Sequence, residues 1–193
     1  QKVNTGLITA ASFTDLPPTD GTWYYRVVLV SQADNASEPS GEASAASDRT
    51  MPSAAIAYTP SGNYDETTGR MAPGLVAVRV TVSEPLQTVP FLSIVPSGGV
   101  PASVQLTAAG DLAYTGYYTI TESTPTGTAA ALFSGRDLVG NRGTSVTSGE
   151  ALNIDTDGPA VGRITVEPHD PVRNDSASPV TVTATFGLNE EVK

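Results

Sequence analysis

Residues 76–82 read VAVRVTV, and this short stretch decides the fold class of the chain. Valine occupies every second position, while Ala77, Arg79 and Thr81 fill the positions between. Successive side chains of a β-strand point to opposite faces, so the valines would form one apolar face of a strand. The stretch therefore predicts a strand in a sheet that packs one face onto a core and turns the other face to water.

The same period of two recurs along the chain, at residues 23–29 and again at residues 180–186. Clusters of Gly, Pro, Asn and Asp separate these stretches, and no window of about twelve residues carries a helical apolar stripe. Short, regularly spaced strands without helices are typical of β-sandwiches. The pattern predicts an all-β chain of antiparallel β-sandwiches.

Two parts of the chain resemble each other at a nearly constant spacing. DRTMP at 48–52 matches DTDGP at 155–159, an offset of 107 residues. GTWYYRVVLVSQADN at 21–35 aligns with GTAAALFSGRDLVGN at 127–141, where Gly-Thr opens and Asn closes both stretches. Agreement of separate matches on almost one offset indicates a tandem repeat.

The repeat predicts where the modules begin and end. Residues 1–51 would be the late half of a first module, 52–158 a complete module, and 159–193 the early strands of a third. We therefore expect a window on a longer tandem array, with sandwiches that are incomplete at both ends. Within this scheme Glu84 of the complete module matches Glu190 of the third.

Composition excludes several classes of partner. Of 193 residues, 20 are acidic and 10 basic, so the formal net charge is −10. Nucleic acids and anionic membranes need a concentrated basic surface, and the chain has no run of apolar residues long enough for membrane insertion. The absence of cysteine excludes a disulfide framework.

The ends of two modules resemble known families of β-sandwich. In the first module, the Leu-Pro turn at 16–17, GTWYYRV at 21–27 and NASEPS at 35–40 resemble the final strands of a fibronectin type III domain. In the middle module, FSGRDLVGNRGT at 133–144 and NIDTDGP at 153–159 resemble bacterial immunoglobulin-like repeats. The resemblance implies tandem immunoglobulin-like or fibronectin III-like sandwiches.

Such arrays belong to large bacterial proteins that are secreted or held at the cell surface. The resemblance implies a structural or adhesive shaft, whose partners are neighbouring modules, identical subunits, or a glycan or protein receptor. A sharper expectation is a filament built by strand complementation, in which residues 180–186 pair with the first half of a neighbour. The alternative is a carbohydrate- or protein-binding accessory module of a secreted multidomain enzyme.

The acids around the second junction are the candidate metal ligands. Asp155 and Asp157 lie two residues apart, and Asp137 stands in the Asp-x-x-Gly-Asn turn of the same module. Calcium takes six to eight oxygen ligands, often carboxylates together with carbonyls, and some tandem adhesin domains hold calcium at their junctions. The other interpretation is structural, because Asp commonly accepts hydrogen bonds from turn amides. Asp137 could cap its own turn or join Asp155 at one end of the sandwich.

Catalysis and sugar binding have less support in the sequence. The single histidine, His169, lies in a loop without an evident serine partner, so we expect no catalytic residues and no enzyme activity. Exposed aromatic side chains form many sugar sites. Alternation leaves Tyr24 and Tyr117 on the outer faces of their strands, which makes them the candidate ligand-binding residues.

Overall fold

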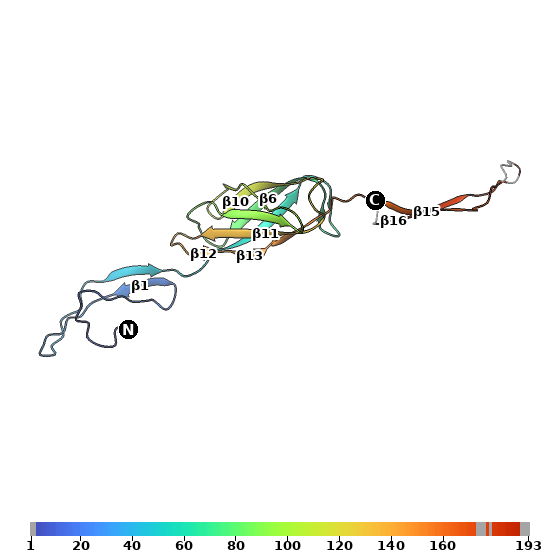
Figure 1. The fold of residues 1–193 in the computed structure, drawn as a ribbon. Helices are drawn as coiled ribbons and strands as arrows, with labels where there is room; N and C mark the ends of the chain where they lie inside the picture. The colour runs from blue at the N-terminus through green and yellow to red at the C-terminus, as the bar shows by residue number, and fades with distance from the viewer. Residues whose placement is uncertain (1–2, 173–176, 178, 190–193) are drawn as a thin grey trace.

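The computed structural model describes residues 3–172, 177 and 179–189, and every regular element in these ranges is a β-strand. With no helix among them, none is long and apolar enough to cross a membrane. Figure 1 shows a central sandwich with a two-stranded ribbon extending from each end. The predicted all-β fold is confirmed for the described residues.

The central sandwich consists of two facing sheets. The first sheet contains, in spatial order, β13 (Ser145–Ser148), β3 (Ser53–Pro60), β6 (Gly74–Val82), β10 (Ala113–Ile120) and β9 (Thr107–Ala108).

The second sheet completes the sandwich. Its strands are, in spatial order, β4 (Tyr64–Asp65), β5 (Arg70–Met71), β14 (Ala151–Ile154), β11 (Gly127–Arg136), β7 (Phe91–Pro96) and β8 (Ala102–Ser103), with β12 (Arg142–Gly143) paired to β11.

The core lies between these sheets and follows the predicted alternation. Val76, Val78, Val80 and Val82 of β6 are all buried, whereas Arg79 between them is exposed. Burying one side chain of this size stabilises the fold by roughly 1.5–3 kcal/mol. The period of two in VAVRVTV therefore corresponds to one strand face packed in the core.

Pairing in the sandwich is mixed, which corrects the expectation of purely antiparallel sheets. β13 pairs with β3 in parallel, and β14 pairs with β5 in parallel. The reason is a crossing of the chain from the first sheet to the second between Ser148 and Ala151. Gly149 makes this crossing with φ +70°, a left-handed conformation that side chains with a Cβ rarely adopt.

The N-terminal ribbon consists of β1 (Gly21–Tyr25) and β2 (Ala43–Ser47), paired antiparallel. Gly21 pairs with Ser47, and in the central sandwich Gly127 pairs with Ile154. These residues are 106 and 107 positions apart, so the ribbon repeats the pairing of β11 with β14. The repeat detected in the sequence is thus visible in the strand register.

The regular strand of this ribbon is shorter than the alternation over residues 23–29 predicts. Beyond Tyr25 the backbone bonds to two serine side chains instead of to a strand. The amides of Val27 and Leu29 donate to Ser40 Oγ at 2.9 Å and Ser37 Oγ at 3.0 Å. Hydroxyl acceptors therefore take the place of strand carbonyls in the NASEPS segment.

The C-terminal ribbon consists of β15 (Val161–Glu167) and β16 (Thr183–Leu188). Val161 pairs with Leu188, just as Ala54 pairs with Val82 in the central sandwich. The ribbon therefore repeats the pairing of β3 with β6. Glu190, which matches Glu84 in sequence, lies outside the described residues.

Candidate metal centre

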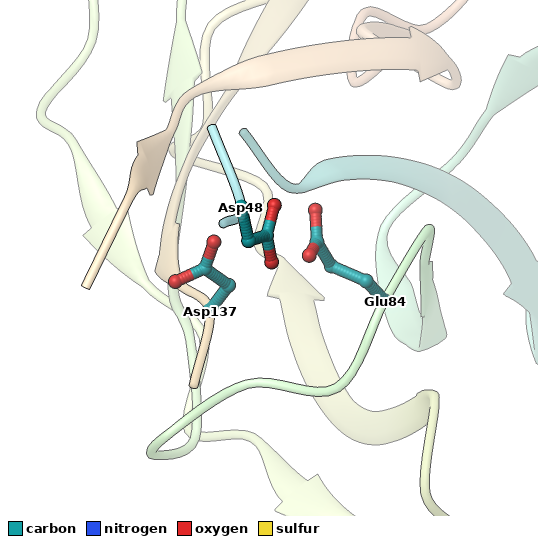
Figure 2. A group of neighbouring side chains, drawn as sticks. All are labelled: Asp48, Glu84 and Asp137. Atoms are coloured by element: carbon teal, nitrogen blue, oxygen red, sulfur yellow. The ribbon is translucent and has the colours of Figure 1, made fainter. Parts of the chain in front are cut away.

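Three carboxylates meet at the end of the central sandwich that adjoins the N-terminal ribbon. They belong to Asp48 in the linker after β2, Glu84 in the loop after β6, and Asp137 in the turn after β11. One oxygen of each lies within 4.8 Å of the others, and Figure 2 shows the three groups directed toward one another. Segments far apart in the chain thus bring acid groups to one point.

Asp137 is held rigidly because its side chain closes its own turn. Its Oδ1 accepts hydrogen bonds from the amides of Val139 at 2.9 Å, Gly140 at 2.6 Å and Asn141 at 2.8 Å. Its Oδ2 accepts from Asn141 Nδ2 at 2.7 Å. The side chain is only 1% exposed, and the turn interpretation of Asp137 agrees with this geometry.

Burial alone would raise the pKa of the Asp137 carboxyl. The hydrogen bonds from Asn141, Gly140 and Val139 outweigh burial and hold the pKa below its ordinary value. Asp137 therefore remains a carboxylate under all but acidic conditions.

Glu84 is placed by the pairing of two loops. Just before it, Ser83 is tied to the start of β3, because Ser53 N donates to Ser83 Oγ at 2.9 Å. Just after it, Leu86 forms an antiparallel bridge with Asp137. Glu84 is thus fixed at both sides and its carboxylate faces the other two acids.

The linker is fixed to both neighbouring units. Asn141 Nδ2 donates to the backbone oxygen of Asp48 at 3.1 Å, and the amide of Thr50 donates to Asp48 Oδ1 at 3.0 Å. From the N-terminal ribbon, Asp20 accepts from Arg49 N at 2.8 Å and from Thr50 Oγ1 at 2.6 Å. These contacts hold Asp48 beside the turn that contains Asp137.

Glu84 lacks a compensating partner. Its Oε1 is buried and accepts no hydrogen bond within the described structure. Burial raises the pKa of this carboxyl, and the negative charges of Asp48, Asp137 and Asp20 raise it further. A buried carboxylate oxygen among other carboxylates is costly without a cation or a donor.

The carboxylates suit a hard divalent cation better than a transition metal. Calcium and magnesium prefer oxygen ligands, whereas zinc is bound mostly through Cys and His. The chain has no cysteine, and its one histidine, His169, lies beyond β15 at the other end of the molecule. The donor set therefore fits calcium in chemical type.

The structure does not bring together the three acids predicted as ligands. Asp155 follows β14 next to the start of β11, whereas Asp137 follows the end of β11. β11 has ten residues, which at roughly 3.3 Å each separates the two acids by about 30 Å. The expected grouping of Asp137 with Asp155 is therefore wrong.

Asp155 and Asp157 have different surroundings from the cluster. Asp155 forms an ion pair with Arg70 Nη1 at 3.0 Å, and its amide donates to Met71 O at 3.0 Å. Asp157 is exposed and belongs to no group of acids among the described residues. The second junction therefore already has a cationic side chain beside its aspartate.

Two members of the cluster were missed by sequence reasoning. Asp48 and Glu84 are 36 positions apart in the chain, and only the tertiary fold shows that they meet. A signal was nevertheless present, because both residues recur in the repeat as Asp155 and Glu190. Acids that recur at both junctions indicated the site better than Asp157, which does not recur.

The two candidate sugar-binding tyrosines are exposed but separate. Tyr24 of β1 and Tyr117 of β10 are 64% and 65% exposed, in agreement with the alternation. They lie in different units, the N-terminal ribbon and the central sandwich. They therefore form no common platform for a ligand.

Comparison with known proteins gives limited information. No family model matches the chain, and no curated protein matches it. Among solved structures, the chain is similar to a tetra-tandem repeat in the extending region of a large adhesion protein, with 17% identity and a TM-score of 0.40. The match covers 86% of this chain and 45% of that one, so the chain spans less than half of that structure.

Proposed function

We propose that the chain is a shaft or spacer segment of a multimodular protein at a bacterial surface or in its secretions, without a catalytic role. The observation that carries the proposal is the recurrence of one strand register in successive units along the chain. Repeated units that each close their own core are suited to spanning a distance. In this proposal the units are tandem immunoglobulin-like or fibronectin III-like modules.

The junctions have features that limit bending. Pro52 and Pro159 fix φ near −65° where each linker enters the next unit. In the first junction Asp20 Oδ1 accepts from Arg49 N at 2.8 Å, and in the second Thr126 Oγ1 accepts from Thr156 N at 3.0 Å. The same linker position is thus bonded back to the preceding unit twice, which favours a stiff connection.

Small-angle X-ray scattering of the 193-residue chain tests the spacer role. We expect a rod-like particle, because the junction hydrogen bonds keep successive units in line. An Asp20→Ala exchange removes the acceptor for Arg49 N and Thr50 Oγ1 and should shorten the maximum dimension by increasing bending. A compact wild-type particle whose units fold back on one another would contradict the proposal.

Calcium bound by Asp48, Glu84 and Asp137 would strengthen the first junction. Asp48 lies in the linker and the other two acids belong to the sandwich, so a shared cation would tie one to the other. The buried, unpartnered Glu84 Oε1 supports this assignment, because a cation would satisfy it. The proposal replaces Asp155 and Asp157 as ligands and keeps Asp137.

Thermal unfolding with and without calcium tests this site. A ligand that binds only the folded state stabilises it by about 2.7 kcal/mol at one hundred times its Kd, which corresponds to roughly 10 °C in Tm. We expect Glu84→Gln to abolish most of this increase. Without calcium the same exchange should leave Tm unchanged or higher, because it removes a buried charge from an acidic cluster.

Asp157→Asn is the matched control, since it removes one exposed acid outside the cluster. It should keep the full response to calcium. A response that is lost in Asp157→Asn and kept in Glu84→Gln would return the site to the second junction. No response in the wild-type protein would refute a calcium site at either place.

The accessory-module alternative has no comparable support. Tyr24 and Tyr117 are exposed, but their separation leaves each as a single aromatic side chain. Sugar sites generally combine aromatic surface with several polar groups directed at one ligand. The geometry therefore favours the shaft over the binding module.

A further inference from the structure

The C-terminal ribbon has one uncharged apolar face. Ile164 of β15 and Phe186 of β16 pair across the ribbon and are 65% and 60% exposed. The charged side chains of β15, Arg163 and Glu167, occupy the alternate positions and therefore point to the other face. An exposed face of this kind is typical of a surface that is normally covered.

The N-terminal ribbon has a similar division of faces. Trp23 and Tyr25 alternate with Tyr24 and Arg26 along β1 and the residue after it. Arg26 pairs with Glu42 at 3.1 Å on the polar side. The face with Trp23 and Tyr25 therefore carries no charged side chain from β1.

The central sandwich shows what covers these faces. The repeat equivalents of Ile164 and Phe186 are Ile56 and Val80, which pair with each other and are both buried. They belong to β3 and β6 of the first sheet. The apolar face of the C-terminal ribbon thus corresponds to one wall of the sandwich core.

The N-terminal ribbon corresponds to the opposite wall. The equivalents of Trp23 and Tyr25 are Ala129 and Ala131 in β11 of the second sheet, and both alanines are buried in the core. The two ribbons therefore correspond to the two facing layers of one sandwich. Their apolar faces are complementary in the way that the central sandwich demonstrates.

We propose that the apolar face of the C-terminal ribbon binds the apolar face of the N-terminal ribbon of a second copy, so that chains associate head to tail. The ribbons extend from opposite ends of the central sandwich, so they cannot meet within one chain (Figure 1). A head-to-tail contact of this kind is heterologous and continues into a linear assembly. The inference rests on the proposed shaft function, which it extends to filament formation.

The contact is face to face and differs from the strand complementation expected from the sequence. Thr183 to Phe186 already pair with β15 of their own ribbon, whereas residues 180–182 form no regular strand. The composite sandwich has no counterpart of β7, whose Ile94 pairs with Ala131 in the centre. Tyr25 stands at the place of Ala131 and supplies side-chain volume there.

Light scattering coupled to gel filtration tests the proposal on the 193-residue chain. Wild-type protein should form oligomers whose mass rises with concentration. Phe186→Asp places a charge on the apolar face and should raise the dissociation constant at least tenfold. Thr185→Asp, its neighbour on the opposite face, is the matched control and should associate like the wild type.

Neither exchange contacts the central core, so both variants should keep the wild-type melting transition of the sandwich. A wild-type chain that stays monomeric at all concentrations would overturn the inference and leave the shaft proposal intact. Equal loss of association in both variants would overturn it as well.

Single cysteines determine the direction of association, because the chain has none of its own. Ala45→Cys marks the N-terminal ribbon and Ala184→Cys marks the C-terminal ribbon, each on its apolar face. A disulfide-linked dimer that forms only when the two variants are mixed supports head-to-tail contact. A dimer that forms from Ala184→Cys alone would show that like ribbons bind each other and would overturn the proposal.

Discussion

Replacing Gly143 by alanine is expected to lower the free energy of unfolding of the central sandwich by about 3 kcal/mol. A Cβ at this position would lie 1.6 Å from the backbone oxygen of Pro52 and 2.6 Å from its carbonyl carbon. Neither atom can move alone, because Pro52 is fully buried where the linker joins the sandwich. The exchange should therefore disturb the first junction as well as the fold.

Urea unfolding followed by tryptophan-independent far-ultraviolet circular dichroism measures this effect. Gly158→Ala is the control, since a Cβ at Gly158 meets no atom within 4 Å and the residue has no positive φ. It should change stability by less than about 0.5 kcal/mol. Similar unfolding midpoints for the two variants would mean that the linker does not pack against β12 as described.

Replacing Asp137 by alanine is expected to lower Tm by roughly 5–15 °C at neutral pH. The exchange leaves the amides of Val139, Gly140 and Asn141 without their side-chain acceptor. Removing one partner of a buried hydrogen bond generally costs more than the bond itself contributes. Because three amides share this acceptor, the turn that positions the metal centre should lose its geometry.

Asp137 also makes a pH-dependent contribution with a definite sign. Its pKa is lower in the folded protein than the ordinary value of 3.8, so the folded state resists protonation of this group. The stability it provides is fully present above pH 3.8 and is lost as pH falls through the folded pKa. The alanine variant should lack this part of the acid sensitivity.

Acid titrations of the wild type, Asp137→Ala and Asp137→Ser separate these effects. In the first unit Ser31 occupies the equivalent turn, and its Oγ accepts from Ala33 N at 3.3 Å and from Asn35 N at 3.2 Å. Asp137→Ser should therefore recover part of the lost Tm but none of the pH dependence. Identical acid profiles for all three proteins would contradict the assigned role of the carboxylate.

The fold was predictable to the extent that it depends on local pattern. The alternating valines of β6 identified a core strand, and the Asp-Gly-Asn signature identified the turn that Asp137 closes. Both features arise from interactions between residues close in sequence. The parallel pairing of β13 with β3 was not predictable in this way, because it depends on where the chain crosses between sheets.

The candidate metal centre shows the same limit more clearly. Asp137 was selected from its turn, but its partners Asp48 and Glu84 come from a linker and a loop that only long-range strand pairing brings together. Asp157 was selected because it neighbours another acid in sequence. On an extended chain, adjacency along the backbone is a poor guide to which carboxylates share a site.

The parallel pairing of β13 with β3 has a mechanical consequence. Tension that enters the sandwich at Ser53 and leaves at Ile154 pulls the beginning of β3 away from the end of the chain that carries β13. The two strands run in the same direction, so the load falls on their hydrogen bonds in shear and all of them resist together. Antiparallel partners pulled from one shared end would instead open one bond after another.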